Sequence, residues 1–137
     1  MAAVPTRTGS VLAAATAAFV LACAGPSAER GAPTGLGEPA AREVLARCAD
    51  AVRDGRAGDA LPLLSARWRA GYTAERLATD LAGAGPAARE AAERVARALD
   101  AGTPIARSAG QARLAVGETR VAVLVLEPGG WRVDALE

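Results

Sequence analysis

The side chains that most often carry out catalysis are scarce in this sequence. Its 137 residues include no histidine, and all 16 basic residues are arginine. Without histidine the chain lacks the commonest general base, the Ser-His and Cys-His nucleophile pairs and the ligands of most zinc sites. Without lysine it lacks Schiff-base chemistry and P-loop phosphate binding. We therefore expect no cofactor and no metal site.

One pair of carboxylates lies at a spacing that could do chemistry. Asp50 and Asp54 would share one face of a predicted helix, where two carboxylates can act as acid and base or hold a metal ion. Arg47 and Arg53, however, lie three residues on either side of Asp50. A charge-paired helix surface therefore explains the carboxylates without any ligand.

Three aromatic residues outside the first 22 residues are the other candidates for a site: Trp68, Tyr72 and Trp131. They could line a ligand pocket, or they could be the largest fillers of a core otherwise built of alanine, valine and leucine. Proton transfer between Tyr72 and Asp80 or Asp134 is conceivable, but nothing in the spacing brings these groups together. We therefore predict no catalytic residue.

The N-terminal residues 1–22 have the features of a secretory signal peptide. Arg7 provides a positive charge, and residues 11–21 form an apolar segment that is shorter than the roughly 20 residues needed to span a membrane. The segment ends in Val20-Leu21-Ala22-Cys23. This sequence resembles the lipobox of bacterial lipoproteins, in which the cysteine receives a diacylglyceryl group and becomes the mature N-terminus. The resemblance implies lipid attachment at Cys23.

The same residues allow another processing route. Ala22-Cys23-Ala24 is also an A-x-A site, and cleavage there would release a soluble periplasmic or secreted protein. Residues 23–38 are rich in glycine, proline, alanine and serine, which predicts a flexible linker spanning about 20 Å. Ala24, rather than aspartate, follows the cysteine, as in lipoproteins sorted to the outer membrane. We therefore expect an outer-membrane lipoprotein facing the periplasm, whose partner is the membrane itself.

Residues 39–137 are predicted to form one domain that begins with about four helices. Apolar residues recur at helical spacing over residues 39–54, and Cys48 falls on this apolar stripe as a small buried hydrophobe. A second helix is expected over residues 58–70, capped by Asp59 and tolerating Pro62 in its first turn. Thr73 would cap a third helix that ends near residue 83, and a fourth would run from Pro86 to about residue 101.

After residue 104 the apolar period changes from helical to alternating. Strands are predicted over residues 105–108, 112–116, 120–126 and 131–136, joined by short glycine-containing turns. Residues 121–126 are apolar at every position, which predicts a central strand with both faces covered. Helices followed by an antiparallel meander of four strands define an α+β domain.

This order of elements resembles the nuclear-transport-factor-2-like (cystatin-like α+β) superfamily, and in particular its small bacterial lipoproteins. The resemblance rests on the Leu63-Leu64-Ser65 helix and on the closing strand that begins Gly129-Gly130-Trp131-Arg132. It implies a cone-like fold, often with a pocket inside. The strands that the superfamily places between its second and third helices are not recognisable here, and none of its catalytic residues can be matched.

Two hypotheses for function follow. The first is a non-enzymatic envelope lipoprotein that binds another envelope protein or a small apolar ligand. The second is a small hydrolase or isomerase that uses a pocket in the same fold. The net charge of +1 and the scarcity of aromatic residues give no reason to expect nucleic acid as a partner.

The lipid anchor can be tested by intact-mass analysis of membrane fractions. The mature wild-type chain should begin at Cys23 and carry the mass of its acyl groups, whereas Cys23→Ala should yield no acylated species because the acceptor thiol is gone. A mature chain that begins at another residue and has no acyl increment would contradict the prediction.

Overall fold

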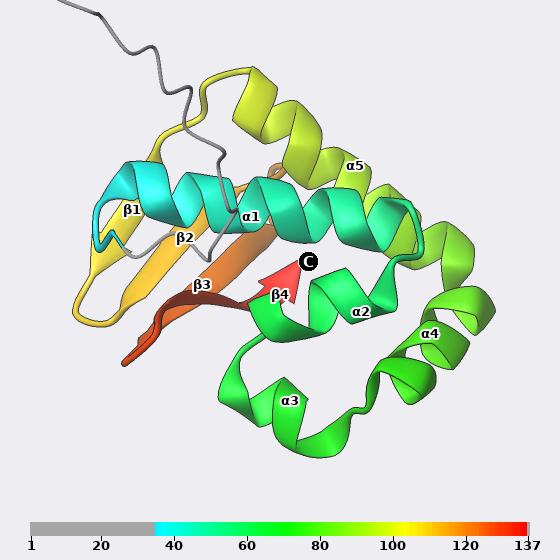
Figure 1. The fold of residues 1–137 in the computed structure, drawn as a ribbon. Helices are drawn as coiled ribbons and strands as arrows, with labels where there is room; N and C mark the ends of the chain where they lie inside the picture. The colour runs from blue at the N-terminus through cyan, green and yellow to red at the C-terminus, as the bar shows by residue number, and fades with distance from the viewer. Residues whose placement is uncertain (1–34, 137) are drawn as a thin grey trace, which may run out of the picture.

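The computed structural model describes residues 35–136, so the predicted signal peptide and Cys23 lie outside the described residues. The helices are α1 (Glu38–Arg53), α2 (Ala57–Ala60), the 3-10 turn η1 (Leu61–Leu63), α3 (Ala66–Gly71), α4 (Ala74–Gly83) and α5 (Gly85–Asp100). The strands are β1 (Ile105–Ser108), β2 (Gln111–Ala115), β3 (Val121–Glu127) and β4 (Gly130–Leu136). Helices followed by one four-stranded antiparallel sheet confirm the predicted α+β class (Figure 1).

Helix α1 is the centre of the packing. Its predicted apolar stripe is buried at Ala41, Val44, Leu45 and Cys48, and it packs against α5 and the sheet (Figure 1). The helix ends where predicted because Gly55 takes a φ of +70°, a conformation that costs residues with a Cβ atom free energy. Because Cys48 is fully buried, the prediction that it acts as a small core residue is confirmed.

The predicted second helix is interrupted. Instead of one helix over residues 58–70, the chain forms α2, η1 and α3, and Asp59 lies inside α2 rather than at its cap. Pro62 lacks the N–H group that a continuing helix needs. Leu64 is extended (φ −78°, ψ 156°) and forms a parallel bridge with Val133, while the Ser65 N–H donates to the Val133 carbonyl at 2.8 Å. A tertiary contact with β4 thus replaces helical hydrogen bonds.

The third and fourth predicted helices are confirmed as α4 and α5. The Thr73 side chain accepts a hydrogen bond from the Arg76 N–H at 3.2 Å, as an N-cap residue does. Pro86 lies in the first turn of α5, and Val95 and Ala92 face the core. Helix α4 is attached less extensively, through a small cluster of buried residues: Ala51, Ala57, Ala60 and Leu77.

The sheet follows the predicted meander, with strand order β1-β2-β3-β4 and every neighbouring pair antiparallel. Gly110, at a φ of +72°, makes the tight turn between β1 and β2. The β3–β4 pairing shifts register between Val123 and Leu124, where Asp134 is the extra residue on β4.

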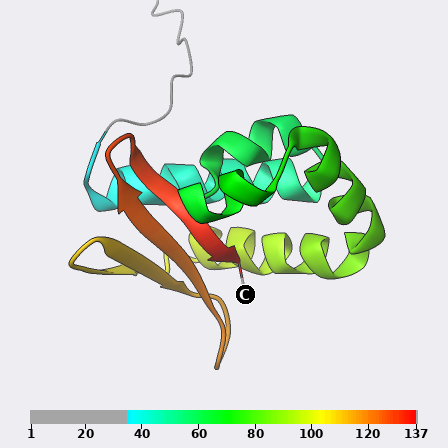
Figure 2. The same cartoon turned by 90° about the horizontal axis from the view of Figure 1, so that it is seen from below.

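The prediction that both faces of β3 are covered is wrong. Ala122 and Leu124 are buried beneath the helices, whereas Val123 and Val125 are half-buried and Val121 is 37 % exposed. The described helices lie on one face of the sheet (Figures 1 and 2), and the burial of Ala122 and Leu124 assigns these residues to that face. Valine is favoured in strands even where it is only partly covered, so an apolar run does not by itself require two covered faces.

Truncation on the two faces of β3 should have unequal effects. Leu124→Ala should lower the free energy of unfolding by about 2–5 kcal/mol, because it leaves a cavity in the core. Val125→Ala on the opposite face should cost about 1 kcal/mol or less, mainly through strand preference. Urea unfolding of both variants measures the difference, and equal losses would mean that the valine face is covered after all.

Candidate functional site

An apolar cavity of about 200 Å³ lies between the α2–α5 helices and the C-terminal end of β4. Leucine, valine and alanine side chains form most of its wall, together with Trp68 and Tyr72. Asp134 is the one charged residue among the described residues that line it. The cavity communicates with solvent and is not an enclosed void.

Small side chains account for the open space. Ala60 of α2 and Ala88 and Ala91 of α5 line the cavity at positions where larger apolar residues would fill it. Helix α4 reaches the same space through Leu77 and Leu81. Because these alanine side chains are short and α4 is attached only loosely, the helices and the end of β4 do not pack tightly against each other here.

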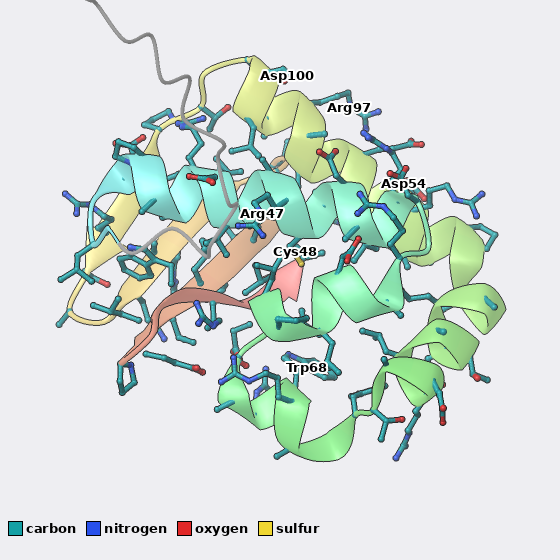
Figure 3. All side chains as sticks on the ribbon, in the orientation of Figure 1. Arg47, Cys48, Asp54, Trp68, Arg97 and Asp100 are labelled. Atoms are coloured by element: carbon teal, nitrogen blue, oxygen red, sulfur yellow. The ribbon has the colours of Figure 1, made fainter. Side chains whose placement is uncertain are left out.

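Trp68 and Tyr72 meet at this cavity. Trp68 lies on α3, Tyr72 directly follows that helix, and the ring centroids are 5.9 Å apart with an interplanar angle of 48°. The Trp68 Nε1–H donates to the main-chain carbonyl of Asp134 at 2.7 Å, which fixes the indole against β4. Trp68 is labelled in Figure 3, where it projects from α3 toward α2. Trp68 as a whole is 37 % exposed, and the guanidinium carbon of Arg67 lies 5.1 Å from its ring centroid.

Trp131, the third aromatic candidate, lies elsewhere. It is 3 % exposed within the main core, and its Nε1–H donates to the Leu36 carbonyl at 3.2 Å. Trp131 is therefore not among the residues that line the cavity with Trp68 and Tyr72.

A polar cluster at the edge of the cavity holds α3 to β4. Ser65 Oγ donates to Asp134 Oδ1 at 2.6 Å, and the Arg67 guanidinium binds both carboxylate oxygens at 3.0 and 3.2 Å. The hydrogen bond from Ser65, with the help of Arg67, lowers the pKa of Asp134 although partial burial opposes the shift. Asp134 is therefore a carboxylate at neutral pH and acts as an acceptor.

A second ion pair holds the same segment to the β3–β4 turn. Arg69 donates to Glu127 Oε2 at 2.7 Å and to the Leu64 carbonyl at 2.8 Å, while the Ala66 N–H donates to Glu127 Oε1 at 2.5 Å. Burial raises the pKa of Glu127, but these hydrogen bonds outweigh it and leave the pKa lowered. This pairing could not be predicted from local sequence patterns, because the partners are about 60 residues apart.

The chemical capacity of the cavity is limited. Tyr72 is hydrogen-bonded to Asp80, which raises the pKa of the phenol, but Asp80 is exposed and does not line the cavity. Burial raises the pKa of the Cys48 thiol to about 12, so this thiol is a poor nucleophile. Within residues 35–136, no three histidine, cysteine, aspartate or glutamate side chains are grouped as metal ligands.

No family model, no curated protein and no solved structure matches this chain. Among the described helices, none is both long and apolar enough to cross a membrane.

The lowered pKa values of Asp134 and Glu127 predict acid sensitivity. In acid, both carboxylates bind fewer protons in the folded chain than in the unfolded chain, where their pKa values are the ordinary 3.8 and 4.5. Their contribution to stability is therefore fully present above those values and is lost as the pH falls through the lowered pKa values of the folded chain. Asp134→Asn should therefore show a smaller loss of stability between about pH 6.5 and pH 3 than the wild type does. Urea unfolding at the two pH values measures this.

Asp100→Asn is a matched control, because Asp100 is an exposed carboxylate at the end of α5 (Figure 3). This variant should keep the acid sensitivity of the wild type. An equally large acid effect in Asp134→Asn and in the wild type would contradict a role for Asp134.

Proposed function

We propose that this chain is a non-enzymatic binding module of the bacterial cell envelope, which holds a small apolar ligand in the cavity beside Trp68 and Tyr72. The observation that carries the proposal is the wall of the cavity, where leucine, valine, alanine and two aromatic rings surround space that reaches solvent. Sites for small molecules are mostly apolar and concave, with few polar groups.

The size of the cavity limits the ligand. Cavities of about 150 Å³ lined by apolar side chains take up molecules the size of benzene, so about 200 Å³ suits one aromatic ring with a substituent or a short alkyl chain. The partly exposed Trp68 side chain adds apolar surface to the lining. Apolar contact, rather than hydrogen bonding, would provide most of the affinity.

The polar groups near the cavity favour binding over catalysis. The Ser65 hydroxyl donates to the Asp134 carboxylate, which is also paired with Arg67 and has a lowered pKa, so this carboxylate is a weak base for activating the serine. The alternative, a small hydrolase or isomerase, has one observation in its favour, the hydrogen bond between Tyr72 and Asp80. Because Asp80 lies outside the lining, this pair is poorly placed to act on a ligand inside.

Membrane tethering is part of the proposal and rests on residues 1–38. A lipid on Cys23 and the linker that follows would hold the domain close to the periplasmic side of the outer membrane, where apolar molecules are concentrated. The resemblance to nuclear-transport-factor-2-like lipoproteins is also kept as a proposal. The order of helices and strands supports it, although residues 54–104 contain no strand.

Binding can be measured by titration calorimetry with toluene as the probe, because one aromatic ring with one substituent matches the size of the cavity. The full chain carrying Cys23→Ala avoids detergent, because it cannot be acylated. It should bind the probe, and Ala88→Phe in the same background should weaken binding by at least about tenfold, since the added ring occupies the cavity. Ala106→Phe adds the same ring at an exposed position of β1 and should bind like the parent.

Two results would refute the binding proposal. One is a parent chain that shows no heat of binding with toluene. The other is an Ala88→Phe variant that binds as tightly as Ala106→Phe.

A further inference from the structure

A second cavity, of about 470 Å³, adjoins the first. Its lining is contributed by α5, by the residue that precedes β3 and by the end of β4: Ala87, Glu90, Ala91, Arg94, Arg120 and Leu136. Ala91 and Leu136 line both cavities, so the two spaces lie next to each other at these side chains. The apolar cavity is therefore adjacent to a region that contains two arginines.

Arg94 is held with part of its hydrogen-bonding capacity unused. Its side chain is only 17 % exposed, and one guanidinium nitrogen pairs with Glu90 at 2.8 Å. The Nε atom is buried and has no hydrogen-bond partner within the described residues. A buried donor without an acceptor costs free energy, which a ligand oxygen could recover.

Arg120 adds a second charge that the described residues leave unpaired. It is exposed, and no ion pair or side-chain hydrogen bond within residues 35–136 engages its guanidinium. Glu90, the acidic residue of this cavity, is 68 % exposed and already paired with Arg94. Among the described residues, the rim therefore has two cations and one anion, a net charge that favours an anionic group.

We propose that the ligand is a single-chain anionic amphiphile. Its head group would bind Arg94 and Arg120, and its apolar chain would pass between Ala91 and Leu136 into the cavity beside Trp68 and Tyr72. This inference rests on the proposed function and adds the chemical class of the ligand.

The two cavities fit the two parts of such a molecule. Arginine binds carboxylate and phosphate oxygens through paired N–H groups, so either head group satisfies the rim. A methylene group is similar in size to a water molecule, which occupies about 30 Å³ in the liquid. The apolar cavity of about 200 Å³ then holds about seven carbon atoms, and a chain of about ten carbons would reach from it to the arginines.

The test is titration calorimetry of the full Cys23→Ala chain with three ligands that share a ten-carbon chain: decanoate, monodecyl phosphate and decanol. At least one of the two anions should bind about tenfold more tightly than decanol, because only the anions can engage the arginines. The preference for one anion over the other distinguishes a carboxylate ligand from a phosphate ligand. Added salt should reduce the advantage of the anions.

Variants locate the head group. Arg94→Gln with Arg120→Gln should bring the affinity for the anions down to that for decanol, while the affinity for decanol stays unchanged and thereby reports an intact fold. Arg97→Gln is the matched control, because Arg97 lies on the outer side of α5 and lines neither cavity (Figure 3). This control should keep the preference for the anions.

Each outcome decides between the two proposals. If all three ligands bind equally to the parent, or if the double variant keeps the preference, the amphiphile proposal is wrong and the apolar-ligand proposal stands. If none of the three ligands binds, both proposals fail.

Discussion

The wall of the candidate cavity depends on one strand-like contact between the helical half and the sheet. Leu64 and Ser65 leave the helical conformation and pair with Val133 on the outer edge of β4, where the Ser65 N–H donates to the Val133 carbonyl at 2.8 Å. An unpaired strand edge exposes backbone donors and acceptors, and this segment satisfies some of them. The contact fixes where α3 lies, whereas α4 is attached to α1 and α2 through Leu77. Together, these attachments determine the space left beside β4.

Arginine chemistry reinforces this contact. The planar guanidinium of Arg69 donates at once to the Leu64 carbonyl and to Glu127, a geometry that the single ammonium group of lysine does not reproduce. Arg67 binds Asp134 in a comparable way, with two nitrogens on two oxygens. The charged groups beside the apolar cavity thus pair with one another and hold the fold together. Arg94 and Arg120 at the adjoining rim, by contrast, retain hydrogen-bond donors that no described residue engages.

Much of the fold could be predicted from local patterns, since α1, α4, α5 and all four strands follow from apolar period, caps and turn glycines. The break at Leu64 could not, because a valine about 70 residues further along supplies its bridge. The one-sided cover of β3 was missed for a similar reason. An apolar run indicates that its residues prefer a strand. Whether both faces of that strand are covered depends on how many helices or sheets the rest of the chain can pack against it.

The candidate site was less accessible to sequence analysis than the fold. Trp68 and Tyr72 could be selected as large aromatic residues, but their separation from Trp131 depends on tertiary packing. The cavity itself arises from alanines, which in a sequence look the same whether they fill a core or leave a gap. The contact of Ser65 with β4 could be anticipated only from Pro62, whose missing N–H group weakens a continuous helix through this segment.

Native-state hydrogen exchange at the Ser65 amide tests this account most directly. If the Leu64–Ser65 segment is docked on β4, that amide should exchange far more slowly than an exposed loop amide, because exchange requires the hydrogen bond to the Val133 carbonyl to open. Exchange of the Ser65 amide as fast as that of an exposed loop amide would show that the segment is not docked. The cavity would then have no fixed wall.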